Sequence, residues 1–309
     1  MEEPRRNIPF DVLIDDSFVN ICTESGLSPI ENKTVLGFAN DYEDGDWWYE
    51  KFQDFLLDHI VEVGLTEKER NSLGPHSQMK KSAKQLRLDS TGGEIGEILM
   101  YAILREWYGA LPIMPKIFFK ENVNDPAKGA DSVHIVIKDD NFEIWFGEAK
   151  FYNDISDTRL YEIVNSVNES LNKDKIRKEN SFIITGKSDI KSFKEISEEM
   201  KDKILKTLDD STSIDKIKRI LHIPILLLYE CQLTKQSIQD CNDETKLKDH
   251  LDKIKEYQKE RATSYFKKQI NKCKEVNLYD KIQFHIILFP VPEKEKIVNM
   301  FTEEIKKYR

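Results

Sequence analysis

The chain has few cysteines and no long apolar segment, and both features limit the classes of protein to which it can belong. None of its 4 cysteines among 309 residues has a Cys-x-x-Cys spacing or a paired-histidine pattern; they are Cys22, Cys231, Cys241 and Cys273. Reduced thiols are therefore expected, rather than disulfides or zinc ligands. No segment approaches the ~18 continuous apolar residues of a membrane span, and the N-terminal stretch lacks the apolar core of a signal peptide. We expect a cytoplasmic protein with no membrane partner.

The chain also lacks an excess of positive charge. It has 47 Lys and Arg against 56 Asp and Glu, which gives a formal net charge of −9. Contacts between cations and phosphates dominate DNA affinity, so this balance argues against an independent nucleic-acid binder. Either a local surface of the chain binds DNA, or a partner protein provides the contacts that hold the DNA. Lysine-rich stretches at 173–191 and 201–219 are present, but a solvated helix face is the favoured interpretation of each.

The most informative segment is an expected hairpin between residues 129 and 150. Two stretches, Ser132–Ile137 and Phe142–Ala149, are rich in β-branched and aromatic residues, and a polar Lys-Asp-Asp-Asn turn separates them. Asp131 precedes the first strand, and Glu148 and Lys150 end the second. Directly opposed residues of an antiparallel pair have Cβ atoms ~5 Å apart. The hairpin therefore brings an aspartate to a Glu-x-Lys sequence.

The register of this hairpin depends on its turn. A two-residue turn at positions 139–140 places Asp131 opposite Glu148, and a turn at 140–141 places it opposite Lys150. Both put the three charged residues on one face, because side chains alternate along a strand. An odd-length turn would separate them. By the same alternation, His134 is expected on the face opposite Asp131.

Context distinguishes this Glu-x-Lys from others in the chain. The chain is 33% charged, and the same pattern recurs in polar segments beginning at Glu31, Glu199, Glu244 and Glu304. Only the pattern at Glu148 ends an apolar strand opposite an aspartate. The alternative is a hairpin with a charged, solvated rim. Two carboxylates this close repel each other without a cation, so we expect metal binding and order of the site to be coupled.

A third acid is expected on a helix upstream of the hairpin. Apolar residues recur at helical spacing between positions 95 and 108, with Thr91 or Ser90 as the N-cap and Gly109 as the stop. Glu94 and Glu97 lie three positions apart in the first turns. Glutamates there also stabilise a helix through its macrodipole, which is the simpler interpretation.

The order of a helical glutamate, a strand aspartate and Glu-x-Lys resembles the PD-(D/E)xK nuclease superfamily. In that pattern a glycine often stands four positions before the helical acid, so Gly93 favours Glu97 over Glu94. Two departures are present. Ala130 replaces the usual proline before Asp131, and the segment between the aspartate and Glu-x-Lys is longer.

A narrower resemblance covers the chain from about Leu13 to Pro290. The segments GGEIGEILMYAIL, GADSVHI and IWFGEAKFYNDIS are similar to the nuclease subunit of the Hachiman anti-phage defence system. The resemblance implies a restriction-endonuclease-like α/β fold, metal-dependent DNA endonuclease activity and a superfamily 2 helicase partner.

The resemblance also implies roles for individual residues. Asp131, Glu148 and the Ala149 carbonyl would hold Mg²⁺ or Mn²⁺, with Glu97, or Glu94 in its place, binding a second ion or a water. Lys150 would orient the water or stabilise the transition-state oxygens. A different hypothesis is a non-catalytic subunit on the same fold that binds and restrains a helicase. RNA as the substrate is a weaker third hypothesis.

The remaining pattern predicts an α/β protein with a mixed sheet flanked by helices. The further expected strands are Asp11–Cys22, Thr34–Asn40, Ser181–Thr185, Ile220–Tyr229 and Lys281–Val291. The further expected helices are Asp46–Val63, Ile155–Glu179, Ser188–Leu208, Glu244–Val276 and Lys294–Lys307. We expect residues 1–80 to form a mixed region packed on the core, and residues 81–309 to form the nuclease core with C-terminal helices.

Overall fold

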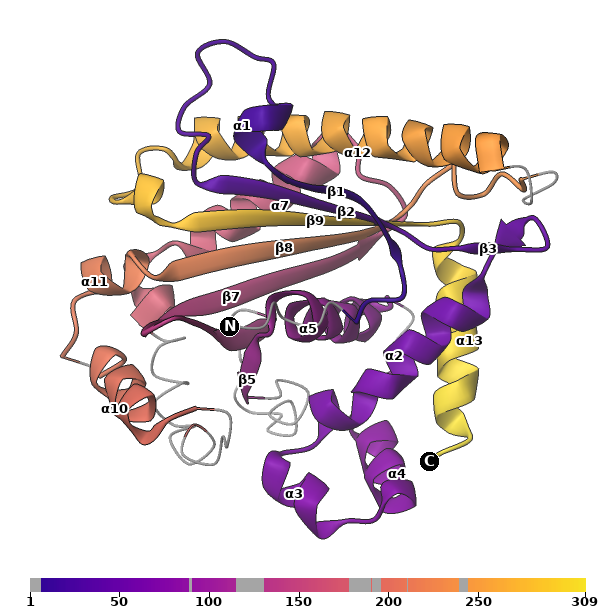
Figure 1. Ribbon diagram of the computed structural model, residues 1–309, viewed down its shortest axis with the longest axis horizontal. Coiled ribbons are helices and arrows are strands. Elements are labelled where there is room, and N and C mark those ends of the chain that lie inside the picture. The colour runs from indigo at the N-terminus through magenta and orange to yellow at the C-terminus, as the bar shows by residue number, and fades with distance from the viewer. Residues whose placement is uncertain are drawn as a thin grey trace.

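Strands alternate with helices in the computed structural model, which describes residues 7–88, 91–114, 131–177, 190, 196–209, 211–238 and 244–309. A seven-stranded mixed sheet lies between two layers of helices (Figure 1). This arrangement confirms the expected fold class. One hydrophobic core fills each side of the sheet.

Four parallel strands form the middle of the sheet, and antiparallel strands flank them. The spatial order is β1 (Asp11–Ser17), β2 (Lys33–Ala39), β9 (Gln283–Val291), β8 (Leu221–Glu230), β7 (Asn141–Tyr152), β6 (Ser132–Lys138) and β5 (Leu111–Met114). β8 and β9 are almost continuously apolar and are buried on both faces, as the sequence predicts for central strands. A small separate hairpin contains β3 (Tyr42–Glu43) and β4 (Asp46–Trp47).

The longer helices divide between the two faces of the sheet. On one face α7 (Asp157–Ser170) packs against α12 (Glu244–Cys273), which crosses the top of Figure 1. On the other face lie α2 (Tyr49–Gly64), α5 (Gly93–Tyr108) and α13 (Lys294–Lys306). Shorter helices are α1 (Phe18–Ile21), α3 (Glu67–Ser72), α4 (Pro75–Gln85), α10 (Glu198–Thr207), α11 (Ile214–Lys218) and the 3₁₀ turn η1 (Tyr279–Lys281).

Several expected elements differ from the observed ones at their ends. The strand expected over Asp11–Cys22 divides into β1 and α1, because Ser17 accepts a hydrogen bond from Val19 N–H and caps the short helix. The helix expected over Ile155–Glu179 is interrupted after Ser170 and resumes at residue 173. The strand expected at Ser181–Thr185 lies outside the described residues. Of the helix expected over Ser188–Leu208, the described part contains α10.

The expected cap of α5 was wrong. The N-cap is Gly92, at a φ of 68°, and the Thr91 hydroxyl accepts a hydrogen bond from Gly93 N–H at 3.3 Å. A positive φ favours glycine. A Cβ at Gly92 would also lie 2.7 Å from Val298 on α13, so close packing requires the same residue. Ser90 lies outside the described residues, and Gly109 ends the helix as expected.

Strands from both sides of residue 80 share the main sheet, since β2 pairs with β9. Phe52, Phe55, Leu56 and Ile60 of α2 are buried in the core. Cys22, Cys231 and Cys273 carry free thiols. Among the helices that the structure describes, none is both long enough and apolar enough to cross a membrane.

Candidate active site

The β6–β7 hairpin has the first of the two expected registers. Lys138 pairs with Asn141, and Ser132 pairs with Gly147. The turn is therefore Asp139–Asp140, and Asp139 adopts a φ of 51°, which aspartate tolerates better than most residues. Side chains alternate along both strands, so Glu148, Lys150 and Asp131 lie on one face of the hairpin.

Asp131 lies where β6 stops pairing with β7. Its N–H donates to the Gly147 carbonyl at 2.7 Å, and its Oδ2 accepts a hydrogen bond from Ala149 N–H at 3.0 Å. The aspartate carboxylate thus takes the place of a strand carbonyl. The N–H and C=O of one strand residue point to the same side. The Ala149 carbonyl is therefore directed toward the Asp131 side of β7.

Lys150 lies between the two acids. Its Nζ is 2.6 Å from Glu148 Oε1 and 4.0 Å from Asp131 Oδ2, and the three side chains are 16–28% exposed. Burial alone would lower the pKa of Lys150, but the carboxylates of Glu148 and Asp131 outweigh it and raise this pKa above its usual value. The structure therefore brings together the three residues predicted from the hairpin. The expected repulsion between the acids is offset by the lysine.

Sequence reasoning missed Ser166 on α7. Its hydroxyl donates to Glu148 Oε1 at 2.9 Å, so the carboxylate has a helix partner as well as Lys150. The available signal was a hydroxyl beside the apolar positions Ile163 and Val167, which α7 buries against the sheet.

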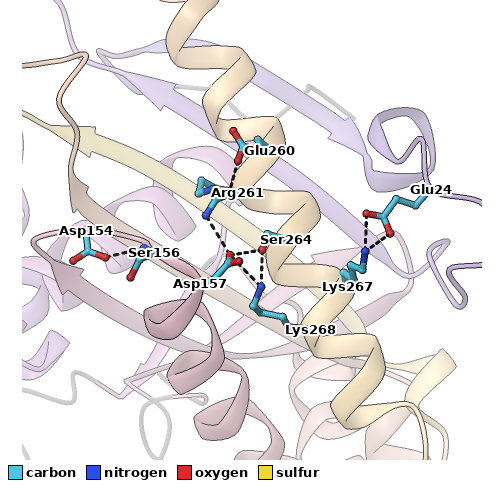
Figure 2. Close-up of polar contacts among 9 residues, drawn as sticks. All are labelled: Glu24, Asp154, Ser156, Asp157, Glu260, Arg261, Ser264, Lys267 and Lys268. Carbon is cyan, nitrogen blue, oxygen red and sulfur yellow. Dashed lines mark hydrogen bonds and ion pairs between the residues drawn. The ribbon is translucent and has the colours of Figure 1, made fainter.

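Contacts with α12 fix the start of α7, as Figure 2 shows. Asp157 accepts hydrogen bonds from Arg261 at 3.3 Å and Ser264 at 2.7 Å, and it lies 3.1 Å from Lys268 Nζ. Hydrogen bonds from Ser264 and Lys268 hold the pKa of Asp157 below its usual value. These contacts border a groove of about 1080 Å³ between α12 and the β1–α1 segment. None of the residues Asp131, Glu148 and Lys150 lines this groove, so we assign it no part in the site.

The helix acids differ in their surroundings. α5 packs on the opposite face of β7, with Gly96 against Ala149 and the Lys150 backbone. Glu94 is buried, and its Oε2 accepts a hydrogen bond from Arg87 N–H at 2.6 Å. Glu97 is only partly buried. The structure does not gather either acid into a metal-binding group, since no three His, Cys, Asp or Glu side chains among the described residues are placed to hold an ion.

The donors at the hairpin nevertheless suit magnesium. Asp131 and Glu148 provide two carboxylates, and the Ala149 carbonyl is directed to the same side of β7 as the Asp131 carboxylate. Mg²⁺ usually retains several waters and binds through one or two carboxylates together with substrate phosphates. Two acids and a carbonyl therefore meet its requirements without a third side-chain acid.

The other face of the sheet carries buried histidine side chains whose pKa values are lowered. His134 is buried there against Tyr101, as its parity predicts, and burial lowers its pKa to about 3. Nearby, His222 and His285 join Nδ1 to Nε2 at 2.9 Å and stack against Trp145. These rings lie on the face of the sheet opposite Asp131.

The fold and the hairpin define a mixed α/β protein with a carboxylate–lysine cluster where an antiparallel strand leaves its partner. Residues 15–305 match the family model described as HamA, which is nearly the whole chain. The chain therefore belongs to the HamA family, the family of the HamA subunit of the Hachiman anti-phage defence system. No curated protein matches the chain.

Proposed function

We propose that this HamA-family protein is a metal-dependent DNA endonuclease of the PD-(D/E)xK type that acts in anti-phage defence with a superfamily 2 helicase subunit. The observation that carries the proposal is the cluster of Asp131, Glu148 and Lys150 at the end of β6. A solvated hairpin rim would not need a carboxylate bonded to the next strand's backbone, nor a lysine held between two acids.

Asp131, Glu148 and the Ala149 carbonyl would hold Mg²⁺ or Mn²⁺ in this proposal. When bound, the ion lowers the pKa of its water and neutralises charge on the phosphate. The Asp131–Ala149 hydrogen bond fixes the carboxylate against β7, and Ser166 orients the carboxylate of Glu148. Both acids are therefore held before any ligand arrives, which lowers the entropy cost of binding one.

Lys150 acts as a cation in this proposal. Its pKa is raised by the two acids, so it keeps its proton near neutral pH and is no general base there. A protonated lysine can donate to the phosphate oxygens as negative charge develops on them. Glu97, the helix acid that the glycine spacing favours, would bind a second ion or a water in this proposal.

The family and the net charge support a helicase partner. The net charge of −9 makes strong DNA binding by this chain alone unfavourable. A motor subunit that holds the DNA would provide affinity and would restrain cleavage of host DNA. Co-purification of the tagged chain with the products of neighbouring genes tests this part of the proposal.

Plasmid cleavage with Mg²⁺ or with EDTA tests the activity. We expect cleavage only with Mg²⁺, by the chain alone or with its co-purifying partner. Glu148→Ala and Lys150→Ala should each lower the rate by about 10²–10³-fold or more, since removal of one preorganised charge stabiliser has an effect of that order. Lys175→Ala is the matched control, because Lys175 is an exposed lysine 3.2 Å from Glu169 in its own ion pair. Undiminished cleavage by both site variants would place the active site elsewhere.

The same assay distinguishes the non-catalytic hypothesis from the nuclease proposal. A purely regulatory subunit would show no metal-dependent cleavage in any preparation, while both site variants would still bind the partner.

A further inference from the structure

Tyr152 extends the polar face of β7 beyond Lys150. It lies two residues further along the strand and therefore on the same face as Glu148 and Lys150. Burial raises its pKa, Lys150 and Arg159 lower it, and Glu162 and Glu148 raise it. The phenol is thus close enough to all four charges to interact with them. Two of these charges belong to the hairpin, and two belong to the first turns of α7.

Arg159 covers the Tyr152 ring. Its guanidinium carbon is 5.4 Å from the ring centroid, and its Nη1 donates to Glu162 Oε2 at 2.8 Å. The Arg159 and Glu162 side chains are 46% and 49% exposed. An ion pair this exposed contributes little to stability. A stronger anion can therefore take the place of Glu162 at small cost to the fold.

We propose that Tyr152 and Arg159 form a phosphate-binding subsite beside Lys150, which holds a backbone phosphate of the DNA strand next to the one that is cleaved. The inference rests on the proposed function and names how the same site binds its substrate. Glu162 acts as a stand-in anion on Arg159 until DNA displaces it.

The chemistry of the pair suits a phosphodiester. Arginine binds phosphate oxygens through two parallel N–H donors, and stacking on an aromatic ring orients that fork before binding. The Tyr152 hydroxyl is a further donor at the same edge. A chain with a net charge of −9 needs a local cation wherever it touches DNA. Arg159 is a half-exposed cation held next to the candidate site.

The chain offers a matched comparison pair. Lys175 and Glu169 form another exposed ion pair, at 3.2 Å, and their side chains are 45% and 71% exposed. The charge types, the exposure of the cation and the separation resemble those of Arg159 and Glu162. Changes specific to a subsite should appear at Arg159 and Glu162 and should be absent at Lys175 and Glu169.

The test measures binding of a fluorescent DNA oligonucleotide by anisotropy across a salt series in EDTA, and cleavage kinetics with Mg²⁺. Arg159→Ala should raise Kd and KM by about 3- to 10-fold with little change in kcat, and should lower the salt slope by about 0.7–0.9, the value for one lost phosphate contact. Glu162→Gln should lower Kd by about threefold, because the competing anion is removed. Tyr152→Phe should raise Kd by about threefold, through loss of one donor.

Opposite shifts for Arg159→Ala and Glu162→Gln, with Lys175→Ala and Glu169→Gln within about twofold of wild type, would support the subsite. If Arg159→Ala and Glu162→Gln behave like these controls while Lys150→Ala abolishes cleavage, the subsite is wrong and the nuclease proposal stands. If wild type neither binds nor cleaves DNA, alone or with its partner, the proposed function fails and the subsite fails with it.

Discussion

The two faces of β7 bury polar groups in opposite ways. On the α7 face, Glu148 lies 2.6 Å from Lys150, and the two side chains form an ion pair. On the α5 face, Glu143 accepts a hydrogen bond from Trp145 Nε1–H at 3.0 Å, and burial raises its pKa. The strand is the same and the acids are only five positions apart, but their partners differ. A neighbouring cation stabilises the charged form of an acid, whereas burial among neutral groups favours the uncharged form.

On the α5 face, His222 and His285 belong to a chain of polar contacts that needs no protonated ring. Thr34 Oγ1 lies 2.7 Å from His285 Nδ1, and His285 Nε2 lies 2.9 Å from His222 Nδ1. His222 Nε2 is 3.5 Å from Glu143 Oε1. If both rings carry their proton on Nε2, every one of these contacts joins a donor to an acceptor. Burial lowers the pKa of His222 to about 3 and that of His285 well below its usual value.

This contrast indicates where each face is vulnerable. The α7 face depends on charge and has the groups that a metal and a phosphate require. The α5 face depends on neutrality and should lose its stability in acid.

Acid should destabilise the fold through the α5 face. His134, His222 and His285 titrate near 6.5 when unfolded but much lower when folded, so below pH 6.5 the unfolded state binds more protons. Stability is therefore lost as pH falls from about 6.5 toward 3, by up to about 1.4 kcal/mol per pH unit for each histidine. Urea unfolding at several pH values between 7.5 and 4.5 measures the slope.

A single variant checks the origin of that slope. His134→Leu should reduce the acid slope, because one of the histidines whose pKa burial lowers is removed. His76→Leu is the control, since His76 is exposed on α4 and should leave the slope unchanged. An unchanged slope in the His134 variant would mean that other groups cause the acid sensitivity.

A smaller effect is expected on the α7 face. Ser166→Ala removes the hydroxyl that donates to Glu148, so we expect a loss of about 1 kcal/mol in stability or less and a few-fold lower cleavage rate. Ser170→Ala is a comparable change on the same helix, because the Ser170 hydroxyl donates to the Val167 carbonyl of its own helix. Equal cleavage by the two variants would mean that Ser166 does not orient the acid.

Local patterns in the sequence predict the hairpin well. Alternation and a polar turn set both strands of the β6–β7 pair and leave two registers, of which the structure has the one with its turn at Asp139–Asp140. The parity of His134 and the face shared by Glu148 and Lys150 follow from the same alternation. The catalytic roles of these residues stay predictions, as do the metal, the DNA substrate and the cytoplasmic location.

Contacts between distant segments were not predictable in this way. Ser166 meets Glu148 only because Asp157 and α12 fix the direction of α7, and those partners are about 100 residues apart in the chain (Figure 2). The histidine cluster requires the neighbouring order of β2, β9, β8 and β7, which no single segment contains. The start of α5 was mispredicted because a left-handed glycine, rather than a hydroxyl cap, makes the turn.

The most direct test of the proposed metal site compares Glu148 and Glu143, the acids on the two faces of β7. Calorimetric titration with Mg²⁺ or Mn²⁺ would compare wild type with Glu148→Gln and Glu143→Gln, two equivalent changes on opposite faces of one strand. We expect binding by wild type and by Glu143→Gln, and affinity at least about tenfold weaker in Glu148→Gln, because a carboxylate ligand is lost. Equal affinity in wild type and Glu148→Gln, or loss of binding only in Glu143→Gln, would contradict it.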